Sequence, residues 1–326
     1  MNPFKALTAP RLPSAAIGLS GEGAGVVSLD RRDNVFVVKR AGYVSLAEGL
    51  VRPNFDESNV ASTGDLANVL AELVAGVGML KRKRWSVALP EAATRTSILT
   101  LETSPGTRAE TEEMLRWKME RAMAAPLDEL RVTRDRLRAD AQGRVRYLVT
   151  AVRLAVLAEY ETVFESLGWH AGLILPRHMG EAWWLMNDAP ARTAASSDSM
   201  LVSAHAEGFT VVVLRGGQPL LVRNVNCDPE DRADELYRFL LFYRDRNAPS
   251  GGLPEEAVRV PTEIIESLFV AGSGLDYEQA QAAVEETLAI APRRLDAADV
   301  HLSLPTPDLD FRHLAAPAGL AALAWG

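Results

Sequence analysis

The chain has 326 residues, and its 35 basic and 43 acidic side chains give a net charge of −8 at pH 7. This length is typical of two domains, and an apolar content of 48% supplies a core and excludes a mostly disordered chain. The acidic balance disfavours nucleic acid binding, which depends on neutralising phosphates. The single cysteine, Cys227, excludes an internal disulfide and a four-cysteine zinc site.

Membrane, export and metal signals are also lacking in the sequence. No apolar run reaches the ~20 residues that a membrane helix needs, and the first residues lack the apolar stretch of a secretory signal. The five histidines form no His-x-x-x-His pair, so no metal site is expected. We therefore expect a protein that stays in the cytoplasm unless a partner holds it at a membrane.

The first half of the chain predicts a β-meander, a long amphipathic helix and an α+β unit. Apolar residues at helical spacing indicate a helix over 63–80 that Ser62 caps, and Thr107 with Glu110 forms a capping box for a second helix. Residues 85–175 are predicted to form a compact α+β unit. Strands are expected at 15–19, 26–29, 35–39, 85–89, 96–101, 132–137 and 145–152, and a further helix at 155–167.

The second half repeats the opening of the first. A small, polar stretch with a proline at 189–199 predicts a boundary, and the same meander follows it about 185 residues after its first occurrence. Strands are expected at 200–204, 209–214, 219–223 and 267–270, and a helix at 277–288. This duplication predicts an α/β fold of two related lobes with a cleft between them.

Three turns are candidates for contact with phosphates. The glycine-rich turn at 20–25 exposes backbone N–H groups, but it joins two strands, and a tight hairpin needs glycine in any case. The turn at 204–208 is weaker, with His205 expected on a surface turn. The turn at 271–274 lies between a strand and a helix, as nucleotide-binding turns and ordinary α/β corners both do. No Ser/His/Asp set or G-x-S-x-G motif indicates a nucleophile.

The order of several motifs resembles that of the PilM family over nearly the whole chain. These proteins are similar to FtsA and have the actin-like ATPase fold. The matching stretches are Val87-Ala88-Leu89-Pro90, Gly216-Gly217-Gln218-Pro219, the helix at 235–243, the turn at 269–274 and Ala318-Gly319-Leu320-Ala321. The resemblance implies a two-lobed actin-like (ribonuclease H-like) α/β fold. The first lobe is expected at 1–195 with an inserted 1C-type subdomain at about 85–175. The second lobe is expected at 196–326, and its last helix packs back on the first lobe.

The resemblance also implies an ATP site between the lobes, which is degenerate in this chain. Ser20 stands where the family has its first phosphate-loop aspartate, and the stretch at 202–205 lacks the second. Without these carboxylates Mg²⁺ loses its usual ligands, and Glu22 adds repulsion. We therefore expect a pseudo-ATPase without catalytic residues, metal or bound cofactor. The residues of the degenerate site are Ser20, Gly21, Gly23, Ala204, Gly208, Gly272, Ser273 and Gly274.

Interaction with a membrane protein is the function that the resemblance implies. A groove beside the helix at 66–80 and the strand at 85–89 is expected to bind the cytoplasmic tail of a PilN-like membrane protein, next to the cationic run at 81–84. The candidate contacts are Leu70, Val74, Val77, Trp85 and Val87; the alternative is that all five are core residues. Other pilus platform proteins, the motor ATPase and self-association into a ring are further expected contacts, and the chain is expected at the inner membrane only through partners.

Two other functions stay open at this stage. An ATP-binding switch could hold phosphates with backbone amides at Gly21, Gly23 and Gly25 alone, and weak dependence on Mg²⁺ would distinguish it. A sugar-kinase-like enzyme on the same fold would need a catalytic aspartate in the cleft, and Asp198 falls in the predicted linker.

Overall fold

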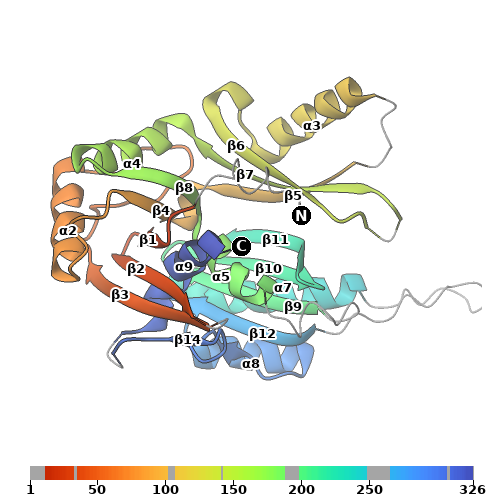
Figure 1. Cartoon of the computed structure of the whole chain (residues 1–326). Helices are drawn as coiled ribbons and strands as arrows, with labels where there is room; N and C mark the ends of the chain where they lie inside the picture. Colours follow the sequence, from red (N-terminus) through yellow and green to blue (C-terminus); the bar gives the residue numbers. More distant parts are fainter. Residues whose placement is uncertain are drawn as a thin grey trace, which may run out of the picture.

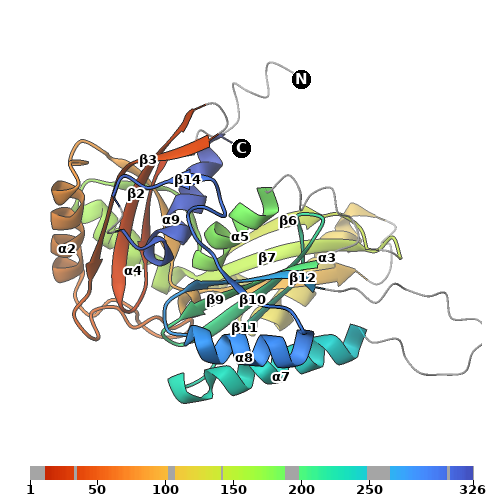
Figure 2. The same cartoon turned by 90° about the horizontal axis from the view of Figure 1, so that it is seen from below.

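The computed structural model describes residues 12–32, 35–101, 107–140, 142–187, 198–247, 265–306 and 309–325. Two large β-sheets stand side by side, and a smaller sheet lies against both of them (Figures 1 and 2). We call the six-stranded sheet with its helices the first lobe, the five-stranded sheet with its helices the second lobe, and the three-stranded sheet with its helix the insert. The predicted boundary at 189–199 lies mostly outside the described residues.

The first lobe is built on an antiparallel meander extended by parallel strands. Alternate residues of its central strand enter two different cores, because neighbouring side chains of a strand point to opposite faces: Ile17 faces helices α2 and α4, whereas Ala16 faces α5 and α9. The strand order is β14-β3-β2-β1-β4-β8. The elements are β1 (Ala15–Leu19), β2 (Gly23–Arg32), β3 (Val35–Ser45), α2 (Thr63–Gly76), β4 (Arg84–Leu89), α4 (Leu154–Ser166), β8 (His170–Pro176), α5 (Arg177–Asn187), β14 (Leu302–Ser303) and α9 (Phe311–Ala322).

Local signals place the helix ends. The Ser62 hydroxyl accepts a hydrogen bond from the Asp65 backbone N–H at 3.2 Å, and Thr107 and Glu110 form the expected capping box. Helix α2 is shorter than predicted, because Gly78 adopts a φ of +74°, which ends the helix and leaves Leu80 exposed on a loop.

The insert is smaller than the unit predicted at 85–175. It comprises β5 (Arg95–Leu101), α3 (Arg108–Met123), β6 (Leu130–Leu137) and β7 (Val145–Arg153) in the order β5-β7-β6. Strands β4 and β8 belong to the first-lobe sheet, where β4 pairs in parallel with both β1 and β8. The prediction was wrong at both ends because a buried strand has the same local pattern in either sheet.

The second lobe repeats the meander, as predicted, and helices cover both of its faces. Helices α7 and α8 cover one face, and α5 and α9 pack against the other, so that α5 and α9 lie between the two large sheets (Figure 1). The strand order is β11-β10-β9-β12-β13. The elements are β9 (Asp198–His205), β10 (Gly208–Arg215), β11 (Gln218–Asn226), α7 (Arg232–Asn247), β12 (Ile265–Gly272), α8 (Tyr277–Leu288) and β13 (Arg293–Arg294).

The C-terminal part of the chain returns to the first lobe. Strand β14 pairs with β3, and α9 lies so close to the central strands that a Cβ on Gly25 would stand 2.7 Å from the His313 carbonyl oxygen. The last helix packs back on the first lobe, as predicted, but the predicted second lobe at 196–326 also includes β14, which completes the first-lobe sheet. The division was wrong there because a two-residue strand such as β14 is specified by its partner and has no pattern of its own.

The insert also contacts the second lobe. Strand β5 lies beside β11 (Figure 1), and the buried Arg146 guanidinium donates to the carbonyl oxygens of Pro219 at 2.8 Å and Leu220 at 3.1 Å. The insert therefore joins both lobes on one side of the molecule.

Candidate functional site

Three tight turns meet between the lobes, at the carboxyl ends of β1, β9 and β12. Parallel pairing sets Gly272 opposite Ala204, and a Cβ on Gly21 would lie 3.4 Å from Glu207 Oε1. Across the lobes, the Ser273 hydroxyl donates to Glu22 Oε2 at 2.7 Å. The structure thus brings together the three turns that carry the predicted site residues. These are Ser20, Gly21, Gly23, Ala204, Gly208, Gly272, Ser273 and Gly274.

The first-lobe turn is closed on itself. The Ser20 hydroxyl accepts from the Gly23 backbone N–H at 3.0 Å and donates to the Gly23 carbonyl at 3.1 Å. A Cβ on Gly23 would stand 2.0 Å from Tyr43 Oη, and the Tyr43 ring stacks on His313 at a centroid distance of 3.8 Å. Burial raises the pKa of the Tyr43 phenol. The Ser20 hydroxyl therefore has its hydrogen-bond partners within its own hairpin. It stands where the resemblance implies an aspartate.

A buried arginine holds the two second-lobe turns together. Arg232, 4% exposed at the start of α7, donates from its terminal nitrogens to the carbonyl oxygens of Ala206 and Gly274. Its Nε has no partner among the described residues. Gly272 has a φ of +80°, and a Cβ there would stand 2.1 Å from the Ala204 carbonyl, so this turn requires glycine. The Arg232 guanidinium thus lies where the two turns meet and fixes their spacing.

The two hairpin turns also carry carboxylates. Glu22 lies in the first, and Glu207 lies in the second, 3.2 Å from His205 Nδ1. His205 is only 4% exposed, so the expectation of a surface histidine was wrong: the residue ends β9, whose end lies against the first-lobe turn. No group of three metal-ligating side chains occurs among the described residues. The two carboxylates add negative charge where the turns meet, and negative charge there is unfavourable for a polyphosphate.

A buried glutamate–histidine contact lies behind the three turns. Glu91 follows Pro90 at the end of β4 and is 2% exposed, with Oε2 2.6 Å from His178 Nδ1 on α5. Its Oε1 accepts from the His178 backbone N–H, and Thr210 of β10 donates to Oε2 at 3.3 Å. Burial raises the pKa of this carboxyl, but the adjacent His178 outweighs burial and lowers it overall. One carboxylate therefore links the first lobe, the interlobe helix and the second lobe.

A second buried carboxyl group, that of Glu181 on α5, has its pKa shifted in the opposite direction. Glu181 is fully buried, and burial raises its pKa against the attraction of Arg177, whose guanidinium lies 3.5 Å away. Helix α5 is pressed against α9 here, because a Cβ on Gly180 would stand 2.1 Å from the Ala316 carbonyl. The two neighbouring buried carboxyls therefore have pKa values shifted in opposite directions, that of Glu91 down by its contact with His178 and that of Glu181 up by burial.

Sequence reasoning missed these buried groups. Glu91 directly follows the Val-Ala-Leu-Pro stretch, and a carboxylate at the carboxyl end of a buried strand is a signal that could have found it. His178 and Glu181, three residues apart on one helix, carry a similar signal.

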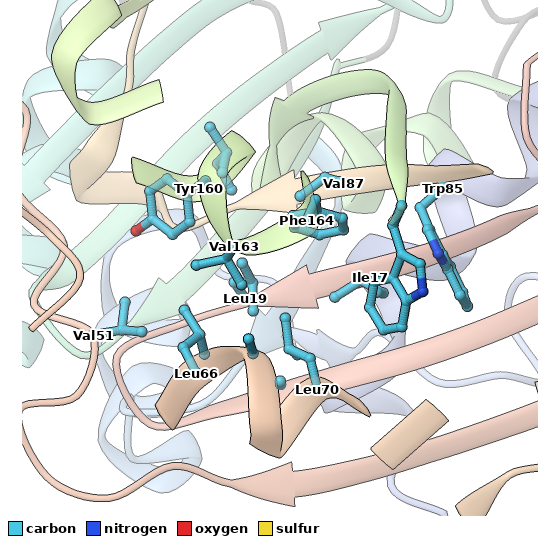
Figure 3. Packing of buried hydrophobic residues seen from close by; sticks show 14 of the residues in the cluster. Ile17, Leu19, Val51, Leu66, Leu70, Trp85, Val87, Tyr160, Val163 and Phe164 are labelled. Carbon is cyan, nitrogen blue, oxygen red and sulfur yellow. The ribbon is translucent and has the colours of Figure 1, made fainter. Parts of the chain in front are cut away.

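The predicted partner residues lie in the core of the first lobe. Leu70, Trp85 and Val87 are fully buried beneath α4, where they pack around Ile17 and Phe164 (Figure 3). Val74 is buried with them, and Val77 is partly buried against the same cluster. A fully buried side chain cannot contact a partner unless the core opens. Four of the five residues are therefore core residues, as the alternative held, and a groove made by them was the wrong prediction; Val77 alone is partly exposed.

A narrow groove lies between two edge strands, one of the first lobe and one of the insert. Strand β8 is the edge of the first-lobe sheet, and β6 is the edge of the insert sheet. Between them runs a small cavity of about 40 Å³. Edge strands present unpaired backbone groups to any chain that can pair with them. The lining residues include Arg131 and Thr133 of β6, Thr150 of β7, and Ile174 and Leu175 of β8.

Comparison with known proteins identifies the fold. No protein-family model matches the chain, and no curated protein matches it in sequence. Among solved structures, a PilM–PilN type IV pilus biogenesis complex aligns at 17% identity and a TM-score of 0.76, over 97% of this chain and 100% of that one. A Bacteroides thetaiotaomicron protein with an actin-like ATPase fold and unknown function aligns at 12% identity and a TM-score of 0.50, over 97% and 98%.

These likenesses agree with the architecture described above. The alignment with the PilM–PilN structure covers 97% of this chain. It therefore spans the duplicated meander, the insert and the three converging turns. The predicted fold class and the resemblance to PilM are confirmed at the level of fold: the chain has a two-lobed, actin-like ATPase fold.

Proposed function

We propose that this protein is a non-catalytic adaptor, a PilM-like component of a type IV pilus or related secretion platform that binds the cytoplasmic tail of a PilN-like membrane protein. The observation that carries the proposal is the direct contact of the two lobes across the candidate ATP site, Glu22 to Ser273 at 2.7 Å. The solved complex of the same fold contains a PilM and a PilN protein, which supports the kind of partner.

The chemistry of the cleft argues for lost catalysis. Ser20 closes its own hairpin, Arg232 donates to two backbone carbonyls, and Glu22 adds a carboxylate where the lobes meet. Hydrolysis of ATP requires the opposite arrangement, with cations or a metal facing the phosphates and a positioned base. Glu91 has the chemistry of a base, but its carboxylate is already engaged by His178 and Thr210.

The groove between β6 and β8 is our candidate for the tail. An extended tail would add to one of the two edge strands and place alternate side chains against Thr133 and Ile174. No helix in the described part of the chain is long and apolar enough to cross a bilayer. In this proposal the tail recruits the chain to the inner membrane, and ring formation, other platform proteins and the motor ATPase are further contacts.

Nucleotide binding is the first test. The purified protein is titrated with ATP, with and without Mg²⁺, by calorimetry and thermal denaturation. The adaptor proposal expects neither heat nor stabilisation at millimolar ATP. Tight, Mg²⁺-dependent binding would refute the pseudo-ATPase.

The tail site has its own test. Co-purification with the PilN-like membrane protein in mild detergent is compared for the wild type, Thr133→Arg and Thr162→Arg. Thr133 is exposed within the groove, whereas Thr162 is exposed on α4 and is not among the residues that line it, so the two variants carry the same substitution at different places. We expect only Thr133→Arg to lose the partner. Equal capture by all three proteins would remove the groove from the proposal.

An ATP-binding switch is the second candidate, and one observation favours it. Three glycine turns and the buried Arg232, whose Nε has no partner among the described residues, converge as they would around an anion. In that case phosphate would be held by backbone amides and arginine, so ATP would bind almost equally well with and without Mg²⁺.

A further inference from the structure

A strongly basic hollow lies at the end of the first lobe opposite the candidate site. Leu19 leads into the interlobe turn, whereas Ala15 and Arg84 stand at the far ends of β1 and β4. The hollow, of about 760 Å³, opens at this far end. Two cations come from β3, three from the loop after α2 and one from the start of β4. They are Lys39, Arg40, Lys81, Arg82, Lys83 and Arg84.

The concentration of charge contrasts with the rest of the molecule. The whole chain has a net charge of −8, yet all six of these cations are exposed at one hollow. Lys39 pairs with Asp30 at 2.9 Å, and Lys83 reaches the Leu167 carbonyl at 3.5 Å. Lys81 and Arg82 lie fully on the surface of the loop. A local field of this kind acts within a screening length of about 8–10 Å, so it orients the molecule toward an anionic surface despite the overall charge.

An apolar side chain stands at the edge of the same cluster. Leu80 is 65% exposed, more than the other exposed large hydrophobic residues of the described chain. It is adjacent in sequence to Lys81, while its neighbour Met79 is buried and anchors the loop in the core. A leucine next to lysine and arginine on a surface loop matches the chemistry of a bilayer interface, where cations contact headgroups and the apolar side chain enters below them.

The position of this face fits a membrane-bound partner. The His170 backbone N–H at the start of β8 donates to the Lys83 carbonyl at 2.7 Å, so the edge strand begins at the basic loop. It ends at Pro176, beside the groove proposed for the tail. A chain that emerges from a membrane at the basic face would meet β8 at its first residue and could follow it to the groove.

We propose that the basic hollow and Leu80 form a docking surface for a bilayer that contains anionic phospholipids. The cations contact lipid phosphates, and Leu80 inserts between the acyl chains. This surface acts without the partner tail, so it goes beyond the adaptor function. An acidic peptide would pair with the cations equally well, but it would not explain why Leu80 is exposed beside them. The bilayer therefore accounts for both observations.

Vesicle co-sedimentation of the full chain tests the proposal. The vesicles contain phosphatidylcholine with or without phosphatidylglycerol, and binding is measured across a series of salt concentrations. The wild type is expected to bind only the anionic vesicles, and salt should weaken the binding. Lys81→Glu combined with Arg82→Glu should lower the affinity by more than about tenfold, since each cation near an anionic surface is worth about a factor of five. Leu80→Ala should weaken binding severalfold and leave the salt dependence unchanged.

The matched control makes the same change in net charge on a different face of the molecule. Arg136 and Arg138 are exposed on the insert, and their double replacement by glutamate removes the same charge from another face. That variant should bind as the wild type does, and thermal denaturation checks that all variants are folded. Inorganic phosphate should not compete beyond the effect of sodium chloride at the same ionic strength.

Four outcomes would overturn the proposal: no binding to anionic vesicles, equal binding to neutral ones, equal loss in the control, or competition by free phosphate beyond this salt effect. Preferential binding to poly-glutamate in a parallel assay would assign the hollow to an acidic peptide instead. Because these vesicles carry no protein, none of these results bears on the groove between β6 and β8.

Discussion

The buried carboxylate at Glu91 gives the sharpest prediction about how the lobes are held together. Glu91→Gln keeps the shape of the side chain and removes its charge. The wild-type carboxylate accepts from the His178 backbone N–H and from Thr210 and lies 2.6 Å from His178 Nδ1. Glutamine has one acceptor oxygen and one donor group, so its amide must face at least one donor. The variant therefore leaves buried polar groups unpaired.

The size of the effect follows from these contacts. Hydrogen bonds to a charged group contribute about 1.5–3 kcal/mol each, and a buried polar group left without a partner costs about 1–3 kcal/mol. We expect Glu91→Gln to lower the free energy of unfolding by about 3 kcal/mol. With an unfolding entropy of about 2.1 cal/mol/K per residue over 326 residues, the melting temperature should fall by about 4–5 °C.

The effect should also depend on pH, with a defined sign. Because the pKa of Glu91 is lower in the folded protein than in the unfolded chain, its carboxylate stabilises the fold at a pH above the unfolded value of about 4.3. This stabilisation is lost as the pH falls through the folded pKa. The gap in stability between wild type and Glu91→Gln should therefore be largest near neutral pH and shrink in acid.

Thermal and urea denaturation at neutral and acid pH measure both quantities. Glu57→Gln serves as the control, because Glu57 is exposed and the substitution makes the same charge change. The reasoning is refuted if Glu91→Gln is as stable as Glu57→Gln at neutral pH, or if the gap to wild type grows as the pH falls.

Three further predictions rest on close packing. Gly23→Ala should destabilise the fold by about 1–3 kcal/mol, because the new Cβ meets Tyr43 Oη at 2.0 Å, and Tyr43→Ala in the same chain should recover part of the loss in denaturation experiments. Arg146→Ala should cost about 1–3 kcal/mol and raise hydrogen exchange in β11, where its two carbonyl partners lie; unchanged exchange would contradict a bridging role. Gly180→Ala should cost about 3 kcal/mol, because its Cβ meets the Ala316 carbonyl at 2.1 Å and neither helix backbone can move aside; a wild-type melting temperature would contradict this.

Local patterns were enough to predict the repeated meander and the helix ends. Alternating apolar residues specify a strand wherever it pairs, and Ser62 and Thr107 make capping bonds within three residues of themselves. The two lobes followed from the recurrence of one pattern in both halves. The three converging turns were found for the same reason, since each follows a recognisable strand.

Assignments that depend on distant partners could not be predicted in this way. Trp85 and Val87 have the pattern of a strand, but only the parallel pairing of β4 with β1 shows that they belong to the first-lobe core. Glu91 and His178 are 87 residues apart in sequence, so their contact has no local signal. The contact of Ser273 with Glu22 depends on how closely the lobes approach, which neither turn encodes alone.

The contacts between the lobes differ in the free energy needed to break them. This difference bears on whether the two lobes can move apart. The hydrogen bond from Ser273 to Glu22 is exposed and contributes about 1 kcal/mol. Behind it, Thr210 of the second lobe donates to Glu91 of the first lobe in a fully buried setting. A switch that opened the cleft would have to expose this second layer, whereas a local rearrangement of the turns would break only the first. This ordering favours lobes that stay closed, as a docking platform for a tail and a membrane requires.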